Sequence, residues 1–234
     1  MPAPATYEDL AGRIDYPLVE PQLTDEQVVE GLKLARRYGV ACAVVRPCDI
    51  DLAVRTLQGG TVRPGAVCGF PHGTQSTAGK LYEARDLLRR GAKEIDMVIA
   101  IPKMLSREFQ HVQAELLQMA ESCHKEGAVL KVILENHYLS DELKIIACRC
   151  AERAEADFVS THTGYAPGGW TPEDVRLMRR HVPEEMGVKV HGIATLAEAL
   201  SAIEAGAGRL GATSPGAVLD EWKQRLAPQP GAVS

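Results

Sequence analysis

The chain lacks the features that mark several large classes of protein. No apolar run approaches about 18 residues, so a membrane span is not expected. The first residues lack a basic segment followed by an apolar one, which argues against a secretory signal. The six cysteines lack the paired spacing of metal sites, which predicts reduced thiols in a cytoplasmic protein. The net charge of −5 disfavours broad binding to nucleic acid.

What is present is an alternation of short apolar strands and amphipathic helices, in a chain whose 45% hydrophobic content is typical of globular proteins. Strands are expected at 13–19, 41–46, 64–70, 94–99, 129–135, 157–163, 188–193 and 208–213. Helices are expected from 24 onward and at 76–90, 108–126, 140–154, 171–181 and 196–205. Five glycines precede strands at the positions of helix C-terminal caps: Gly39, Gly91, Gly127, Gly187 and Gly206.

Eight strand–helix units predict an α/β fold, a closed (β/α)8 barrel forming a single domain over residues 1–234. No dinucleotide-type glycine fingerprint follows the first strand, so an organic cofactor is not expected. The segment 227–234 is rich in Pro, Gly and Ala and is expected to be a frayed tail. Active sites of such barrels lie at the carboxyl ends of the strands.

Several motifs occur in the order found in one enzyme family. The segment Asp-Phe-Val-Ser-Thr-His-Thr-Gly-Tyr at 157–165 is similar to the Asp-Phe-Val-Lys-Thr-Ser-Thr-Gly-Phe of deoxyribose-phosphate aldolases. The segments at 69–73, 94–99, 130–135, 187–189 and 209–214 also resemble that family. The resemblance runs from about residue 10 to 222 and implies a carbon–carbon lyase acting on a small hydroxy-carbonyl or sugar-derived substrate.

The resemblance also implies roles for individual residues. Asp96 would be the carboxylate that assists proton transfer, and Lys189 would be the second active-site lysine. Lys131 and Glu135 would form the polar floor of the site. Ser160 occupies the position of the lysine that forms an imine with the substrate, and a hydroxymethyl group cannot form an imine. The sequence therefore predicts a non-standard mechanism.

Other departures argue against a single substitution introduced at position 160. The family's phosphate-binding turn reads Gly-Gly-Ile-Arg-Thr, whereas this chain has Gly-Ile-Ala-Thr at 192–195. The loss of one glycine and of the arginine puts a phosphorylated substrate in doubt. The candidates that remain for binding substrate are Gly192, Gly211, Thr213 and Ser214.

Histidines stand near the expected strand ends, at 72, 137, 162 and 191. Because strand side chains alternate in direction, His162 would share a face with Ser160, His191 with Lys189, and His137 with Glu135. His162 and His191 are candidate catalytic groups, and His137, His162 and His191 are candidate ligands for zinc, manganese or iron. The alternative is that they fill space vacated by the lysine or lie in loops.

Two further features leave alternatives open. Lys189 or Lys131 would serve as a relocated imine-forming lysine if burial favours the free amine, or both belong to a structural network of lysines and carboxylates. Four residues, Glu20, Arg46, Tyr165 and Trp170, lie in loops at the same end and would either shape specificity or simply pack.

The sequence thus favours an aldolase-type lyase. The alternatives are a metal- or histidine-dependent hydrolase, isomerase or decarboxylase on the same barrel, and an inactive homologue that binds a metabolite. The expected partner is a small carbonyl compound, with neither nucleic acid nor membrane, and the sequence leaves open a monomer or a homodimer.

Overall fold

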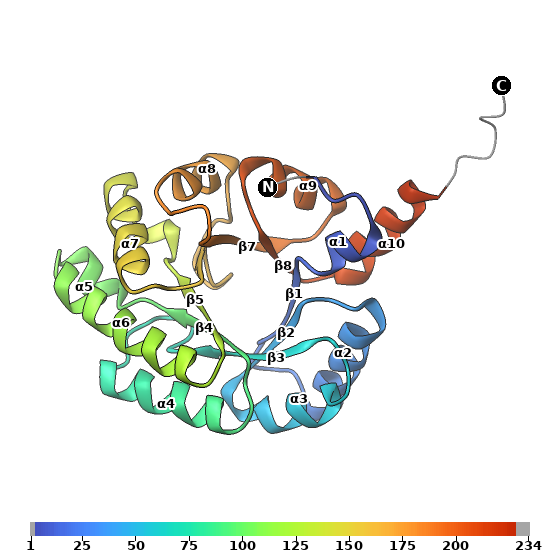
Figure 1. The fold of residues 1–234 in the computed structure, drawn as a ribbon, viewed down its shortest axis with the longest axis horizontal. Helices are drawn as coiled ribbons and strands as arrows, with labels where there is room; N and C mark the ends of the chain where they lie inside the picture. Colours follow the sequence, from blue (N-terminus) through green and yellow to red (C-terminus); the bar gives the residue numbers. More distant parts are fainter. Residues whose placement is uncertain (1–2, 228–234) are drawn as a thin grey trace.

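Eight parallel strands form a closed barrel with helices on its outside (Figure 1). The protein is described by a computed structural model over residues 3–227. The strands are β1 (Ile14–Leu18), β2 (Cys42–Val45), β3 (Arg63–Cys68), β4 (Glu94–Val98), β5 (Val129–Ile133), β6 (Phe158–Ser160), β7 (Gly187–Ile193) and β8 (Arg209–Ala212). Each pairs with its neighbour in sequence, and β8 pairs with β1, which closes the barrel. The predicted (β/α)8 architecture is confirmed.

The helices that follow the strands form the outer layer. They are α2 (Asp25–Tyr38), α3 (Ile50–Leu57), α4 (Thr77–Arg89), α5 (Ile101–Leu105), α6 (Phe109–Lys125), α7 (Asp141–Arg153), α8 (Pro172–Arg180), α9 (Leu196–Ala205) and α10 (Pro215–Leu226). A short helix α1 (Tyr7–Ala11) precedes the barrel, and single 3-10 turns lie at η1 (Pro47–Asp49) and η2 (Asn136–Tyr138).

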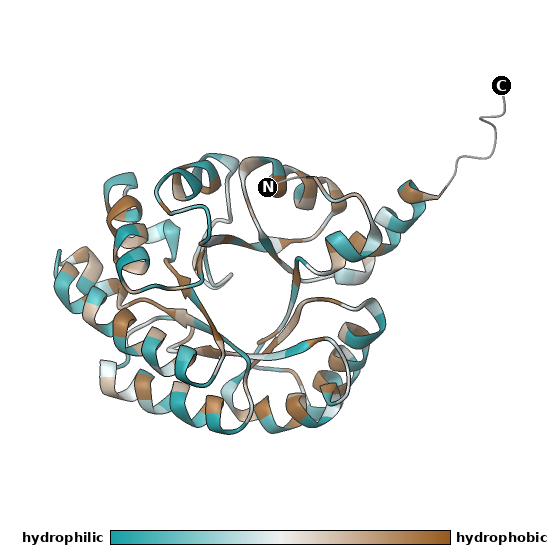
Figure 2. Ribbon diagram, in the orientation of Figure 1, coloured by the Kyte–Doolittle hydropathy of each residue, from teal (hydrophilic) through white to brown (hydrophobic). Residues whose placement is uncertain are grey.

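The local signals explain where these helices begin and end. Thr24 and Gln27 form the expected capping box at the start of α2, because each side chain binds the other residue's backbone N–H. Gly39 and Gly206 end α2 and α9 in the left-handed conformation, which glycine adopts without a steric penalty. The helices carry hydrophobic residues toward the barrel and hydrophilic ones outward (Figure 2).

Some expectations about the elements were wrong. Gly187 is not a helix cap but the first residue of β7, where the Phe158 ring lies against it. Helices α1, α3, α5 and α10 were not predicted, and three of them have eight residues or fewer, too short for a clear periodicity. Of the expected frayed tail, residues 228–234 lie outside the described part of the chain.

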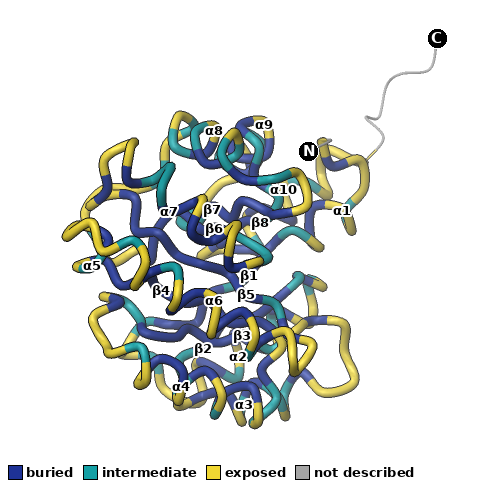
Figure 3. Tube along the Cα trace, turned by 60° about the vertical axis from the view of Figure 1, so that its left-hand side comes forward, coloured by how far each residue is buried: buried dark blue, intermediate teal, exposed yellow. Residues whose placement is uncertain are grey.

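The core lies between the barrel and the helices, and the strands form the buried centre of the molecule (Figure 3). Exposed residues are concentrated in the loops and on the outer helices. Within residues 3–227, no helix combines the length and apolar character needed to cross a membrane. The barrel therefore provides a rigid frame, and the side chains at its centre determine what it does.

Candidate active site

A network of six charged side chains, five of them buried and Arg209 partly buried, fills the barrel interior. Its members are three carboxylates and three cations: Asp15, Glu94, Asp96, Lys131, Lys189 and Arg209. The ammonium of Lys131 lies 2.7 Å from Asp15 Oδ2, 2.6 Å from Glu94 Oε2 and 2.9 Å from Asp96 Oδ1. Lys189 contacts Asp15 Oδ2 at 2.7 Å and also Asp96. The charges balance, which a low-dielectric interior requires.

The network keeps its members ionised. Burial raises the pKa of Asp96, but the ammonium groups of Lys131 and Lys189 outweigh burial and hold that pKa below its ordinary value. The pKa of Asp15 is lowered in the same way. Burial alone would lower the pKa of Lys131, yet its three carboxylate neighbours raise it well above the ordinary value. Asp96, Asp15 and Lys131 therefore stay charged at neutral pH.

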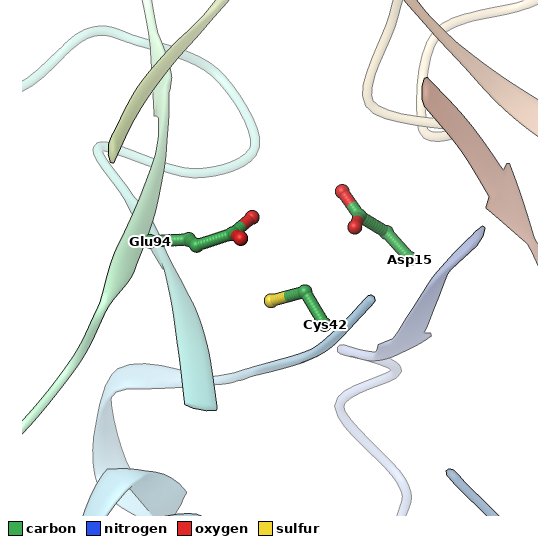
Figure 4. A group of neighbouring side chains, drawn as sticks. All are labelled: Asp15, Cys42 and Glu94. Carbon is green, nitrogen blue, oxygen red and sulfur yellow. The ribbon is translucent and has the colours of Figure 1, made fainter. Parts of the chain in front are cut away.

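One group of metal-type donors lies within this network. In the described part of the chain, only Asp15, Cys42 and Glu94 bring three such ligand atoms within 4.8 Å of one another (Figure 4). The Lys131 ammonium contacts both carboxylates of this group. Burial also raises the pKa of the Cys42 thiol well above its ordinary value, which disfavours the thiolate that metals require. An internal ammonium thus already neutralises these carboxylates.

A narrow pocket opens above the network at the carboxyl ends of the strands. Its polar lining comes from Asp15, Asp96, Ser160, His162, Thr163, Lys189 and His191, and its apolar lining includes Val19, Val44, Val67, Phe70 and Ile133. The pocket is continuous with a wider mouth through shared residues such as His162, Thr163 and His191. Five predicted catalytic residues thus meet in one pocket: Asp96, Ser160, His162, Lys189 and His191.

Two buried polar atoms at this pocket have neither a hydrogen-bond nor an ion-pair partner in the described structure: Ser160 Oγ and His162 Nε2. His162 Nδ1 accepts a hydrogen bond from the Gly164 N–H at 3.0 Å. In the neutral ring the proton is therefore assigned to Nε2, which makes that atom a donor. Burial lowers the pKa of His162, which favours the neutral ring. An unpaired buried donor of this kind is suited to a ligand oxygen.

His191 also lines the pocket, with its ring 5.4 Å from that of His162 in an edge-to-face arrangement. Burial, followed by the neighbouring His162 and Lys189, lowers the pKa of His191 to about 3. A Cβ at Gly211 would lie 2.7 Å from Nδ1, and one at Gly164 would lie 3.0 Å from Nε2. The two glycines therefore make room for this ring.

Contrary to the sequence-based prediction, Glu135 does not form part of the floor of the central pocket. It follows β5 in the left-handed conformation with φ 57°, which breaks the alternation of a strand. Its Oε2 accepts hydrogen bonds from the N–H and hydroxyl of Thr163, and Glu135 lines a side groove rather than the central pocket. Burial raises the pKa of Glu135. Lys131 lies in the interior network, whereas Glu135 holds the loop after β6 near the pocket.

The three histidines considered as metal ligands do not gather. His137 lies beyond the end of β5 in η2, is exposed, and packs against Tyr138. No group of three donors within residues 3–227 includes His137, His162 or His191. The alternation that would have placed His137 beside Glu135 on one face fails because β5 ends at Ile133.

The four residues predicted to bind substrate do not all line the same space. Gly211 lines the inner pocket, whereas Gly192 and Thr213 line its mouth. Ser214 lies at the start of α10, where its side chain makes no capping hydrogen bond, and it lines neither space.

Three network members were not predicted as site residues: Asp15, Glu94 and Arg209. Arg209 Nη1 lies 2.7 Å from Asp15 Oδ1. The signal that could have identified them is a charged residue inside an otherwise apolar barrel strand, since such a side chain needs a buried partner.

A closed barrel with a lysine–carboxylate network under a pocket at the carboxyl ends of its strands defines the class of the protein as an α/β-barrel enzyme. The family model described as DeoC/LacD family aldolase matches residues 16–218, so the chain belongs to that family.

Known relatives agree with this assignment. The chain is 42% identical to a deoxyribose-phosphate aldolase of Caldanaerobacter subterraneus subsp. tengcongensis, over 93% of this chain and 95% of the relative. It is 42% identical to that of Thermococcus gammatolerans, over 88% and 93%. The tetrameric deoxyribose phosphate aldolase of Aeropyrum pernix superposes with a TM-score of 0.84 at 35% identity, over 94% and 93%. The family and these relatives imply an aldolase-type lyase.

Proposed function

We propose that this protein is a carbon–carbon lyase that makes or breaks an aldol bond in a small hydroxy-carbonyl compound without an imine at position 160. The observation that carries the proposal is the convergence of three groups on one pocket. They are the Lys189 ammonium, the Ser160 hydroxyl and the His162 Nε2–H, and the last two have no other partner in the described structure.

These groups suit the electronic demand of aldol cleavage. In aldol cleavage the β-hydroxyl loses its proton to water and becomes a new carbonyl, while the electron pair of the breaking carbon–carbon bond moves toward the existing carbonyl. The oxygen of that carbonyl gains negative charge as an enolate, whose carbon then takes a proton from water. Preorganised donors and a fixed positive charge in a pocket with little water stabilise such an oxygen. Lys189, Ser160 and His162 would supply them, and Asp96 and Asp15 would hold the ammonium in place.

Lys189 is better suited to this role than to forming an imine itself. It must lose its proton before it can attack a carbonyl, and the groups in contact that would accept the proton are Asp15 and Asp96. The pKa values of both carboxylates are held low by neighbouring ammonium groups, so they are poor acceptors. The contacts therefore favour the ammonium over a relocated nucleophile.

Borohydride trapping combined with turnover separates the mechanisms. The full-length protein, Ser160→Lys and Lys189→Met are incubated with a panel of hydroxyaldehydes, reduced with borohydride and weighed by mass spectrometry. We expect the parent to turn over an aldol without a covalent adduct and independently of chelator. Lys189→Met should lose the activity by about 100-fold or more, the effect of removing one oxyanion partner. Ser160→Lys should form an adduct.

Three other results would each favour a different function or mechanism. A parent adduct located on Lys189 would establish a relocated imine and refute the proposed role of the ammonium. Activity abolished by chelator and restored by zinc or manganese would favour metal-dependent chemistry. Binding of a carbonyl compound without turnover of any aldol would favour an inactive metabolite-binding homologue. The serine at position 160, which cannot form an imine, also supports that alternative.

A further inference from the structure

A side groove lies beside the central pocket, between the loops that follow β3, β4, β5 and β6. Its lining includes His72, Ile101, Leu105, Glu135, Tyr138 and Tyr165. The ring of Tyr165 packs edge-to-face on that of Phe70, with centroids 5.4 Å apart, and Phe70 lines the central pocket. Thr163 is the one described residue that lines both spaces. The groove is therefore a neighbour of the central pocket and not part of it.

Glu135 brings to this groove a buried carboxylate that is only half paired. The residue is 1% exposed, and its Oε2 accepts hydrogen bonds from the N–H and hydroxyl of Thr163. Its Oε1 is the only buried carboxylate oxygen of residues 3–227 with neither a hydrogen bond nor an ion pair, since Glu94 Oε2 and Asp96 Oδ1 pair with Lys131. Because an unpaired buried acceptor is costly, this oxygen is suited to a donor from a ligand.

The groove offers no lysine or arginine to compensate the carboxylate. Neither residue type occurs among the described residues that line it. The imidazoles of His137 and His72 favour the charge of Glu135, but neither ring makes a hydrogen bond or ion pair with it in the described structure. Burial is the largest influence on the pKa of Glu135 and raises it, as expected for a carboxylate with little compensation. These charges favour a cationic ligand over an anionic one.

The walls of the groove suit the hydrocarbon part of a ligand. Six large hydrophobic residues are exposed in the described part of the chain, and three of them line this groove: Leu105, Tyr138 and Tyr165. Exposed apolar side chains that gather in this way mark binding sites, and tyrosine rings also attract cations. A metal ion is disfavoured, because no group of three donors within residues 3–227 includes Glu135 or His72.

We propose that the side groove is a second ligand site, which binds a small primary ammonium compound with an apolar body. The ammonium group donates a hydrogen bond to Glu135 Oε1 and neutralises the carboxylate, while the apolar body packs against Leu105 and Tyr138. This inference goes beyond the proposed lyase function and does not depend on it, because binding in the groove requires no aldol chemistry.

Calorimetric titration with three probes of similar shape tests the choice of head group. Benzylammonium, benzyl alcohol and benzoate share a phenyl ring and carry a cation, a neutral donor and an anion. We expect the parent to bind benzylammonium at least about tenfold more tightly than the other two, because a buried hydrogen bond between charged groups is the stronger one. Equal affinity for benzylammonium and benzyl alcohol, tighter binding of benzoate, or no binding of benzylammonium at millimolar concentration would overturn the proposal.

Three variants locate the binding. Glu135→Gln keeps an oxygen for Thr163 and removes the charge, so its affinity for benzylammonium should fall by about tenfold or more, toward that of benzyl alcohol. Asp157→Asn is the matched control, because Asp157 is a partly buried carboxylate that accepts the Leu130 N–H at 2.7 Å and lies outside the groove. It should match the parent. Tyr138→Ala removes an exposed ring of the wall and should lose about threefold, a test that holds if Glu135→Gln folds poorly.

Unchanged benzylammonium affinity in both Glu135→Gln and Tyr138→Ala, or an equal loss in Asp157→Asn, would refute the assignment of the groove. Because these titrations involve no turnover, the two proposals fail separately. If no aldol is turned over but benzylammonium binding depends on Glu135, the lyase function fails while the groove site stands. If an aldol is turned over and benzylammonium does not bind, the reverse holds.

Discussion

At the residue scale, Ser160 is the position where this chain departs most from the family pattern that it resembles. Its hydroxyl is buried at the pocket and has no hydrogen-bond partner in the described structure. A side chain kept only for stability would normally satisfy such a group, because an unpaired buried hydroxyl is costly. The arrangement therefore suggests that Ser160 serves a ligand rather than the fold.

A Ser160→Ala variant should distinguish a role in ligand binding from a role in stability. We expect kcat/KM for aldol turnover to fall by about 100-fold, the effect of removing one donor to a developing oxyanion. The free energy of unfolding should stay within about 0.5 kcal/mol of the parent or rise, because no protein hydrogen bond is lost. Steady-state kinetics and urea unfolding measure the two quantities. A loss of more than about 1 kcal/mol of stability with unchanged turnover would assign Ser160 to the fold.

His191 should make stability depend on pH. Its pKa is lowered from 6.5 to about 3 in the folded protein, so between these values the unfolded chain binds the proton and the folded chain does not. Stability should therefore fall as pH decreases from 6.5 toward 3, by at most about 1.4 kcal/mol per pH unit. Urea unfolding of the parent and His191→Asn across this range measures the effect.

The variant should show a shallower decline below pH 6.5 than the parent. The same substitution at the exposed His137 is the control for the loss of an imidazole. Part of the acid sensitivity will remain in His191→Asn, because burial also lowers the pKa of His162 below 6.5. Near the acid end of the range, the unfolded chain also protonates Asp15 and Asp96 below about pH 3.8, while the folded chain keeps them charged. Identical slopes in the parent and His191→Asn would show that His191 is protonated in the folded state.

At the element scale, the strands were predictable because each is a short apolar run between turn residues. Each of the eight overlaps its expected position, although β3, β5 and β6 end two or three residues earlier than expected. Side-chain direction was predictable where the backbone stays extended, as it does for Ser160 and His162 at the end of β6, which both line the pocket. The pair Lys189 and His191 lies within β7, and both residues line the pocket. Glu135 and His137 follow β5, where the left-handed residue 135 breaks the alternation. Such a local conformation is fixed by tertiary contacts, here with Thr163, which a single sequence does not reveal.

The packing of β6 against β7 depends on Gly187. A Cβ at this position would lie 2.1 Å from Phe158 Cε1, on the residue that pairs with it across the strands. We expect Gly187→Ala to cost about 1–3 kcal/mol, because the ring must leave its place. Gly39→Ala is the matched control, since its Cβ would meet nothing within 4 Å and only the positive φ is strained.

Urea unfolding measures both glycine variants. The double variant Phe158→Leu/Gly187→Ala should recover part of the loss, because a smaller side chain removes the overlap. A Gly187→Ala variant no less stable than Gly39→Ala would contradict this account of the β6–β7 contact.

At the scale of the whole molecule, the barrel is built around a charge balance. The six interior charges come from β1, β4, β5, β7 and β8, so the network joins strands that are far apart in sequence. It also links the two lysines, because Asp15 and Asp96 contact both Lys131 and Lys189. A second buried pair, Lys80 with Glu115 at 3.0 Å, lies outside the pocket and provides a comparison.

Replacement of Lys131 by Met should therefore affect both stability and chemistry. It leaves three carboxylates facing two cations, and we expect a loss of about 3–5 kcal/mol, typical of an uncompensated buried charge. Adding Glu94→Gln restores the balance, so the double variant should be more stable than Lys131→Met alone, and its turnover can be measured even if the single variant does not fold.

Lys80→Met should also lose stability, but without a change in the pH dependence of kcat/KM, because its pair does not contact Lys189. Urea unfolding and pH–rate profiles of the four proteins distinguish these effects. If Glu94→Gln brings no recovery, the interior is held by individual contacts and not by its overall balance of charge.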